Sequence, residues 1–323
     1  MADIPRAVAL LRAGELVAFP TETVYGLGAD AGNPGAIARI FAAKGRPADH
    51  PLIVHLPDAS HLERWAVDIP EAARKLAAAF WPGPLTLILK RHASVQDAIT
   101  GGQDTVGLRV PNHPLALQLL REFGGANGGG LAAPSANRFG HVSPTTAAHV
   151  REELGDAVAM ILDGGPCAVG IESTILDLSS GEPRILRPGM LDADAIGAVL
   201  GRPPAFGGEQ NAPRVSGSLE AHYAPRTPLR LVAAADLATA ARQALEAGQR
   251  IAVLASEPPV SGDSNMIWSA AGTDATRFAH DLYARLREFD ALDCDLILVA
   301  APPDAEAWRA VADRLRRAAA GSK

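Results

Sequence analysis

Four cationic side chains stand at places in the sequence where they could bind a negatively charged ligand. Two of them, Lys44 and Arg46, straddle Gly45 and precede Pro47. The glycine lets the backbone come close to a bound group, and the proline stiffens the loop. Two cations held so close suit a polyphosphate or a carboxylate. Cations at the end of a predicted helix also complement its dipole, so this segment alone leaves both interpretations open.

The other two cations belong to predicted strands. Arg109 lies inside an apolar strand pattern, and Arg187 ends another strand just before Pro188. A buried arginine needs an anionic partner, either from the protein or from a ligand. Taken with Lys44 and Arg46, these residues are typical of a phosphate-handling site that has no P-loop.

Polar side chains also gather at the ends of predicted strands, where active sites are usually built. The groups are Thr21, Glu22 and Thr23, then Ser135, Asn137 and Ser143, and finally residues 170–174. Hydrogen bonding within turns explains each group equally well. His222 and Tyr223 form an aromatic pair among small residues, which indicates docking either onto the first domain or onto a ligand.

Common nucleotide and hydrolase motifs are missing from the sequence. It has no Gly-x-x-x-x-Gly-Lys-Ser/Thr loop, no His-Glu-x-x-His and no Gly-x-Ser-x-Gly. The glycine-rich run at 124–130 follows a predicted helix, so it is interpreted as a loop and not as a phosphate cradle. Any ATP site must therefore be built in another way.

The composition is that of an ordinary globular protein with room for two cores. The chain has 323 residues, 48% of them apolar, and a net charge of −6, which favours two domains and argues against a protein that coats nucleic acid. Two cysteines cannot make a disulfide framework or a four-cysteine zinc site. No secretory signal or membrane-spanning stretch is apparent, and we expect a cytoplasmic protein.

The hydrophobic pattern indicates which elements position these side chains. In the first two thirds of the chain, apolar runs alternate with helical patterns, which predicts an α/β domain. The predicted helices cover residues 34–43, 71–80 and 113–123. The predicted strands cover residues 16–19, 52–56, 85–89, 106–110, 131–133, 158–162, 174–178 and 184–186.

A linker is predicted where the pattern stops, at residues 202–227, which are rich in proline and glycine. Beyond it, the order strand, helix, strand, strand, helix, strand, helix predicts a small Rossmann-like domain without a phosphate fingerprint. We therefore expect domains at 1–201 and 228–323.

The motifs together resemble one family, the L-threonylcarbamoyladenylate synthases of the YrdC family in their longer two-domain form. The matching segments are residues 20–27, 44–47, 51–52, 81–86, 107–111, 134–137, 170–174, 186–189 and 222–225, in this order. The resemblance implies a twisted α/β YrdC-type domain with a concave cavity. The smaller C-terminal α/β domain matches only in size and pattern.

The resemblance also implies roles for individual residues. The family signature corresponds to Lys44, Arg46, Ser135 and Asn137, which are the expected catalytic residues. The expected L-threonine site consists of Thr23, His55, Arg109, Ala133 and Ser173. The expected ATP site consists of Arg46, His50, Thr105, Ser135, Ser143, Arg187 and Tyr223, with the linker closing over it as a lid.

The implied reaction joins L-threonine, bicarbonate and ATP into threonylcarbamoyl-AMP and pyrophosphate. The product serves the threonylcarbamoyl-transferase machinery that modifies tRNA, and direct tRNA binding by this chain stays open. No metal-ligand cluster is apparent, so Mg²⁺ is expected to arrive with ATP.

Two other functions compete with this one. A non-enzymatic module that binds double-stranded RNA would use the same cavity, but the net charge of −6 argues against it. A carbamoyl-transfer enzyme of the hydrogenase-maturation type would carry cysteine-rich zinc fingers, which two cysteines cannot supply.

Overall fold

The computed structural model describes residues 3–125, 128–207, 212–258 and 263–322. The chain divides into two compact units. Unit 1 comprises residues 1–139 and 143–218, and unit 2 comprises residues 140–142 and 219–323. Residues 126–127 of the glycine-rich run and 208–211 of the predicted linker lie outside the described part.

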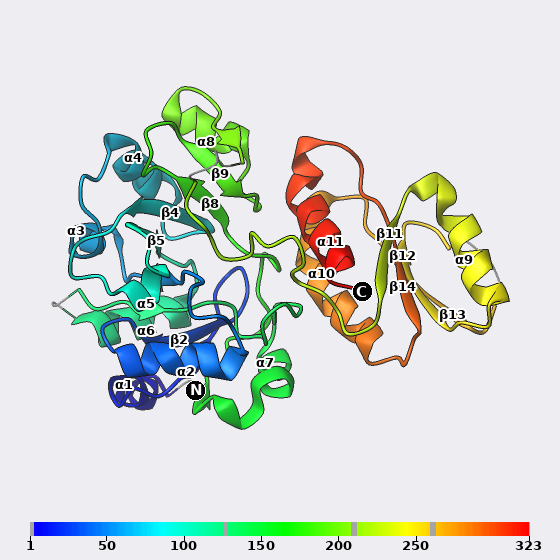
Figure 1. Ribbon diagram of the computed structural model, residues 1–323, viewed down its shortest axis with the longest axis horizontal. Helices are drawn as coiled ribbons and strands as arrows, with labels where there is room; N and C mark the ends of the chain where they lie inside the picture. Colours follow the sequence, from blue (N-terminus) through cyan, green and yellow to red (C-terminus); the bar gives the residue numbers. More distant parts are fainter. Residues whose placement is uncertain (1–2, 126–127, 208–211, 259–262, 323) are drawn as a thin grey trace. The chain divides into compact units, whose positions relative to one another are not determined.

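Unit 1 is built on a ten-stranded mixed sheet, ordered β10-β9-β8-β4-β5-β3-β6-β2-β1-β7 (Figure 1). Its strands are β1 (Val17–Phe19), β2 (Gly26–Asp30), β3 (Ile53–His55), β4 (Leu85–Lys90), β5 (Thr105–Arg109), β6 (Leu131–Ala132), β7 (Met160–Ile161), β8 (Thr174–Asp177), β9 (Arg184–Arg187) and β10 (Ala205–Phe206). Its α-helices are α1 (Ile4–Arg12), α2 (Pro34–Lys44), α3 (Leu62–Trp65), α4 (Glu71–Phe80), α5 (Asp97–Thr100), α6 (Pro114–Gly124), α7 (Ala147–Leu154) and α8 (Ala193–Leu200).

One face of this sheet is covered by helices. Alternate strand residues such as Val54, Leu87 and Leu176 share a buried cluster with Ile40 of α2 and Leu76 of α4. Burial of this much apolar surface is the main stabilising contribution to the unit. The period of two along each strand then sends the intervening side chains to the opposite face.

The opposite face is covered in a different way along its length. Near β1, α1 and α6 cover it, and Leu11 and Leu119 pack on Phe19. Further along the sheet, Ile53, Ile88 and Ile175 form a small cluster with Val215. Val215 belongs to the predicted linker, so a segment of irregular chain covers this region.

Unit 2 is a four-stranded parallel sheet, ordered β11-β14-β12-β13. Its strands are β11 (Leu229–Val232), β12 (Ile251–Ala255), β13 (Met266–Ala270) and β14 (Leu296–Ala300). Helix α9 (Leu237–Glu246) lies on one face, and α10 (Ala275–Asp290) and α11 (Arg309–Gly321) lie on the other (Figure 1). The predicted order of elements is confirmed here.

The structure differs from the prediction mainly at short or glycine-containing elements. The sequence pattern missed five helices, α1, α3, α5, α7 and α8. It also missed the strand β2, whose Gly-Leu-Gly-Ala-Asp sequence lacks the usual strand composition. Strand β10 lies inside the predicted linker and pairs with β9 through Ala205 and Arg184. The last helix, α11, starts at Arg309, after a 3-10 turn at Glu306–Trp308.

Candidate functional site

The registers of the central strands place five predicted site residues on one sheet face. His55 and Arg109 are partners in the β3–β5 ladder, as are Ile53 and Gly107. Because residues i and i+2 share a face, His55 and Arg109 lie on the same face as Ile53. The same alternation adds Thr105 of β5, Ser173 just before β8, and Arg187, which is the ladder partner of Ile175.

Arg109 is buried and paired with a protein carboxylate. Its Nη2 atom lies 2.7 Å from Oε1 of Glu22, and its Nε donates to the Gly83 carbonyl at 3.3 Å. The side chains of Arg109 and Glu22 are 5% and 8% exposed, respectively. The anionic partner that a buried arginine requires is therefore present in the ligand-free protein.

His55 is a neutral imidazole beside this pair. Burial first, and the positive charge of Arg109 second, lower the pKa of His55 to about 3. Its ring packs edge-on against Phe19, with centroids 6.0 Å apart, and its Nδ1 atom has no well-aligned hydrogen bond within the described part of the chain. A neutral imidazole can donate to or accept from a hydroxyl group.

The pKa of His55 predicts acid-sensitive stability. In the unfolded chain His55 takes up a proton near pH 6.5, whereas in the folded protein it does so only near pH 3. The unfolded state thus binds more protons across this window, and stability falls as the pH drops through it. We expect His55→Gln to remove about 3 kcal/mol of the stability difference between pH 7 and pH 4. Urea unfolding of both proteins at the two pH values measures this, and parallel losses would contradict it.

Arg46 and Arg187 converge on the same linker residue. Arg187 donates from Nη1 to the Ser216 carbonyl at 2.9 Å, and Nη1 of Arg46 lies 3.5 Å from the Ser216 hydroxyl. Arg46 also donates from Nη2 to the Pro51 carbonyl at 2.9 Å. Arg187 further binds the Ser173 carbonyl and hydroxyl. Two of the four predicted cations, Arg46 and Arg187, therefore contact the same residue.

Lys44 connects the end of α2 to the Ser135–Asn137 segment. Its Nζ donates to the carbonyls of Ser135 and Asn137, at 2.5 Å each. Gly45 ends α2 in the left-handed conformation, with φ of 59°, which directs the chain from Lys44 to Arg46. The structure therefore brings Lys44 together with Ser135 and Asn137, through their backbone.

The remaining predicted contacts are held by short hydrogen bonds. Thr23 bonds to Thr21 between hydroxyls at 2.9 Å, and the Ser173 hydroxyl lies 2.8 Å from that of Thr86. Ser143 donates to Glu172 at 2.6 Å. Ala133 is buried after β6 and donates its N–H to the Ile53 carbonyl at 3.0 Å. These groups are positioned before any ligand binds.

His50 is half-buried, as are Thr105 and Ser135. Its ring meets Phe139 edge-on, with centroids 5.2 Å apart. Burial, and then the charge of Arg46, lower the pKa of His50. The influence of Arg46 indicates that His50 lies on the same side of this region as the Lys44–Arg46 segment.

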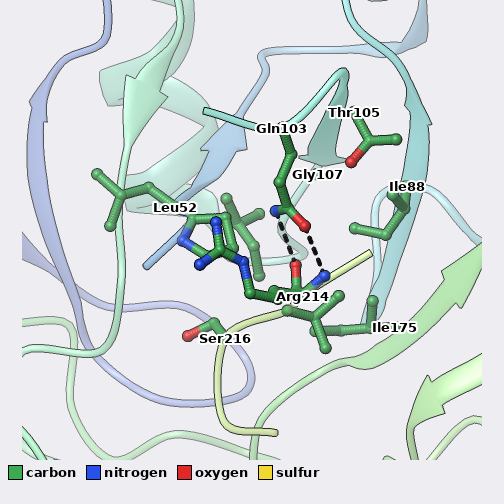
Figure 2. Close-up of a pocket in the computed structure, with 11 residues that line it drawn as sticks. Leu52, Ile88, Gln103, Thr105, Gly107, Ile175, Arg214 and Ser216 are labelled. Atoms are coloured by element: carbon green, nitrogen blue, oxygen red, sulfur yellow. Dashed lines mark hydrogen bonds between the residues drawn. The ribbon is translucent and has the colours of Figure 1, made fainter. Parts of the chain in front are cut away.

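The linker crosses the sheet face that carries Ile53, Ile88 and Ile175 and borders a pocket (Figure 2). The pocket is narrow, with about 10 Å³ of space for water-sized groups, and is lined by Thr105, Gly107, Ile175 and Ser216, among others. Gln103 binds the backbone of Arg214 on both sides: it accepts from the N–H at 2.6 Å and donates to the carbonyl at 3.1 Å. Of the predicted site residues, Thr105 lines this pocket.

Tyr223 belongs to unit 2, unlike the other predicted site residues. Its backbone has a positive φ of 62°, and its ring stacks on Tyr283 with centroids 5.8 Å apart. The guanidinium of Arg314 lies 5.1 Å from the ring centroid. These contacts fix the end of the predicted linker onto α10 and α11.

Four residues with clear roles in this geometry were not predicted: Glu22, Gln103, Glu172 and Ser216. Glu22 lies in one of the clusters of polar residues, but only the fold reveals its pairing with Arg109. Gln103 and Ser216 carry no sequence signal, because an amide and a hydroxyl in loops are usually solvated. Across the part of the chain that the structure describes, no group of three or more His, Cys, Asp or Glu side chains could hold a metal ion. Likewise, no described helix is long and apolar enough to cross a membrane.

Two family models match the two parts of the chain. Residues 9–189 match the Sua5, YciO and YrdC family, described as "Telomere recombination". Residues 191–320 match the model described as "Threonylcarbamoyl-AMP synthase, C-terminal domain". The first match alone covers more than half of the chain.

Relatives and solved structures agree with these matches. A threonylcarbamoyl-AMP synthase of Bacillus subtilis is 42% identical, covering 99% of this chain and 93% of the relative. One from Pyrococcus abyssi is 39% identical, covering 97% and 92%. The crystal structure of Pyrococcus abyssi Sua5 complexed with L-threonine superposes with a TM-score of 0.90 at 39% identity, covering 99% and 94%.

Proposed function

Because the chain belongs to the threonylcarbamoyl-AMP synthase family in its two-domain form, we propose that it condenses L-threonine, bicarbonate and ATP into threonylcarbamoyl-AMP and pyrophosphate. It is thus an ATP-dependent nucleotidyltransferase. The observation that carries the proposal is the shared sheet face of His55, Arg109 and Arg187. This face offers two buried cations and a neutral imidazole beside a pocket in a single domain.

The threonine site centres on Arg109. Its guanidinium binds the substrate carboxylate, and His55 and Thr23 bind the side-chain hydroxyl. The backbone of Ala133 and the hydroxyl of Ser173 complete this site. The support is that His55 is the ladder partner of Arg109 and is held neutral by burial.

The ATP site lies around Arg46 and Arg187, which converge at Ser216. Their guanidinium groups offset charge on the phosphates and on the leaving pyrophosphate. Thr105, Ser135, Ser143 and His50 contact the nucleotide, and Tyr223 is the further nucleotide contact that the family resemblance implies. Mg²⁺ enters with ATP, bound to the phosphate oxygens.

The chemistry needs orientation and charge neutralisation more than covalent catalysis. The threonine amine and bicarbonate give a carbamate, and a carbamate oxygen attacks the α-phosphorus of ATP, expelling pyrophosphate. Lys44 and Asn137 hold the Ser135 segment in place for this step. Exclusion of water protects the carbamate and the mixed anhydride from hydrolysis.

The linker at 202–227 acts as a lid over the ATP site, and it connects a catalytic domain at 1–201 with a C-terminal domain at 228–323. Support comes from Val215, which packs on Ile53, Ile88 and Ile175, and from the hydrogen bonds between Gln103 and the Arg214 backbone. The product then passes, in the cytoplasm, to the transferase machinery that modifies tRNA.

We expect Gln103→Ala to loosen this lid. Losing two hydrogen bonds worth about 1 kcal/mol each should raise trypsin cleavage after Arg214 about tenfold or more. The matched control is Gln118→Ala, because the Gln118 amide bonds to Glu122 on an exposed helix face. Equal cleavage rates in both variants would show that Gln103 does not hold the linker.

The function itself is tested by incubation with ATP, Mg²⁺, L-threonine and bicarbonate, followed by mass analysis and pyrophosphate measurement. Threonine-dependent release of pyrophosphate together with threonylcarbamoyl-AMP supports the proposal. Tight binding of double-stranded RNA without any such product would favour the binding-module alternative.

A further inference from the structure

The Glu22–Arg109 ion pair is buried, and backbone groups bind both of its side chains. Oε2 of Glu22 accepts from the Asn112 N–H at 3.0 Å, and Nε of Arg109 donates to the Gly83 carbonyl at 3.3 Å. The Glu22 carbonyl also accepts from the Val169 N–H at 2.7 Å. Backbone groups therefore hold Oε2 of Glu22 and Nε of Arg109, the atoms of the pair that do not face each other.

The two atoms of the pair that face each other leave hydrogen-bonding capacity unused. Oε1 of Glu22 and Nη2 of Arg109 are 2.7 Å apart, yet neither makes a well-aligned hydrogen bond within the described part of the chain. A buried ion pair contributes little to stability, because desolvation offsets the attraction. An imperfectly aligned pair contributes still less, which points to a role in ligand binding.

We propose that Glu22 binds the ammonium group of the threonine substrate and accepts its proton. The inference rests on the proposed threonine site at Arg109. Free threonine is a zwitterion at neutral pH, so a buried carboxylate beside a buried guanidinium matches both of its charges. When threonine binds, its carboxylate pairs with Nη2 of Arg109 and its ammonium pairs with Oε1 of Glu22.

The proton transfer balances without any further reactant. An ammonium nitrogen has no lone pair and cannot form the new nitrogen–carbon bond. Glu22 carboxylate and threonine ammonium give Glu22 carboxylic acid and the neutral amine, whose lone pair then attacks the carbon of bicarbonate. The amine and bicarbonate give the carbamate and water, and Glu22 returns its proton to solvent after the reaction.

The surroundings of Glu22 make this role testable by pH. The titratable or charged groups facing it are Arg109 of β5, His113 at the start of α6, and Cys167, with His55 next to Arg109. Burial raises the pKa of the Cys167 thiol to about 12, and burial lowers the pKa of His113. Between pH 7 and 9, the Cys167 thiol therefore stays protonated, and His113 and His55 stay neutral.

The first test compares ligands that lack one charge. Calorimetry measures binding of L-threonine, of 2-amino-1,3-butanediol, which lacks the carboxylate, and of 2,3-dihydroxybutanoate, which lacks the ammonium. Glu22→Gln should weaken the two amines about tenfold or more and leave the dihydroxy acid unchanged or tighter, because Arg109 loses its competitor. Arg109→Lys should weaken the two carboxylates and spare the aminodiol.

The outcomes separate the inference from the proposed site. If Arg109→Lys weakens the carboxylates but Glu22→Gln weakens all three ligands or none, the role of Glu22 is wrong and the threonine site stands. If Arg109→Lys changes no affinity, the threonine site itself is misplaced. Thermal unfolding of each variant checks the fold, and Glu22→Asp, which keeps the charge, replaces Glu22→Gln if that protein does not fold.

The second test is pH rescue of adenylate formation. The rate of Glu22→Gln at low threonine should be at least about 100-fold lower at pH 7. It should then rise towards the wild-type rate up to pH 9, as free threonine loses its proton in solution. A constant ratio of variant to wild-type rate across this range overturns the proton-accepting role.

Discussion

Replacing Arg46 with methionine is expected to lower threonylcarbamoyl-AMP formation by at least about 100-fold and to leave the fold intact. Arg46 is 7% exposed, and its guanidinium meets Ser216, which Arg187 also binds. A fixed cation at the position where negative charge develops typically contributes two or more orders of magnitude to the rate.

The loss of rate in Arg46→Met should arise from the steps that involve ATP. Pyrophosphate release measured against ATP concentration should show a lower kcat/KM for ATP, while calorimetric threonine affinity changes less than about threefold. Arg74→Met is the matched control, because Arg74 forms an exposed pair with Glu63 and such pairs contribute little. A fully active Arg46→Met would mean that the phosphate site lies elsewhere.

Long apolar patterns allowed most of the fold to be predicted. Helix α4 occupies the predicted residues Glu71–Phe80, and β4 (Leu85–Lys90) extends the predicted strand 85–89 by one residue. In both elements, the apolar pattern and the residues that end the element indicate the same bounds, as Pro82 does after α4. Helices α7 and α8 were missed because eight residues each are too few for a helical period to be recognised.

Strand β2 shows why local sequence could not supply the rest. Its glycines are required by packing and not by turns: a Cβ at Gly28 would come within 2.8 Å of the Phe19 ring. The strand is stabilised by its partners β1 and β6, which the sequence pattern cannot identify.

The same limit applies to the site. Sequence motifs identified the four cations, but the residue that pairs with each cation depends on strand register and loop contacts. The pairing of Arg109 with Glu22 joins β5 to the loop after β1, and the pairing of Arg187 with Ser216 joins β9 to the linker. Interactions between residues so far apart in sequence follow from the sheet order, which local patterns do not encode.

Replacing Lys44 with methionine is expected to cost both stability and activity. Lys44 is 3% exposed, and its ammonium satisfies the carbonyls of Ser135 and Asn137. Leaving these two carbonyls without a donor costs about 1–3 kcal/mol each, so the free energy of unfolding should drop by about 2–6 kcal/mol. The Ser135–Asn137 segment would then shift, and adenylate formation should fall at least about 100-fold.

Lys44 also predicts a pH dependence that separates it from a surface lysine. Burial first, and the charge of Arg46 second, lower the pKa of Lys44 well below its usual value. The folded protein therefore binds fewer protons there than the unfolded chain, so this group makes stability rise with pH up to about 10.5. Urea unfolding at pH 7.5 and 9.5 should show this rise in the wild type and in the control Lys90→Met, whose lysine forms an exposed pair with Asp68. In Lys44→Met the rise should be smaller; an equal rise in all three proteins would mean that the pKa of Lys44 is not lowered in the folded protein.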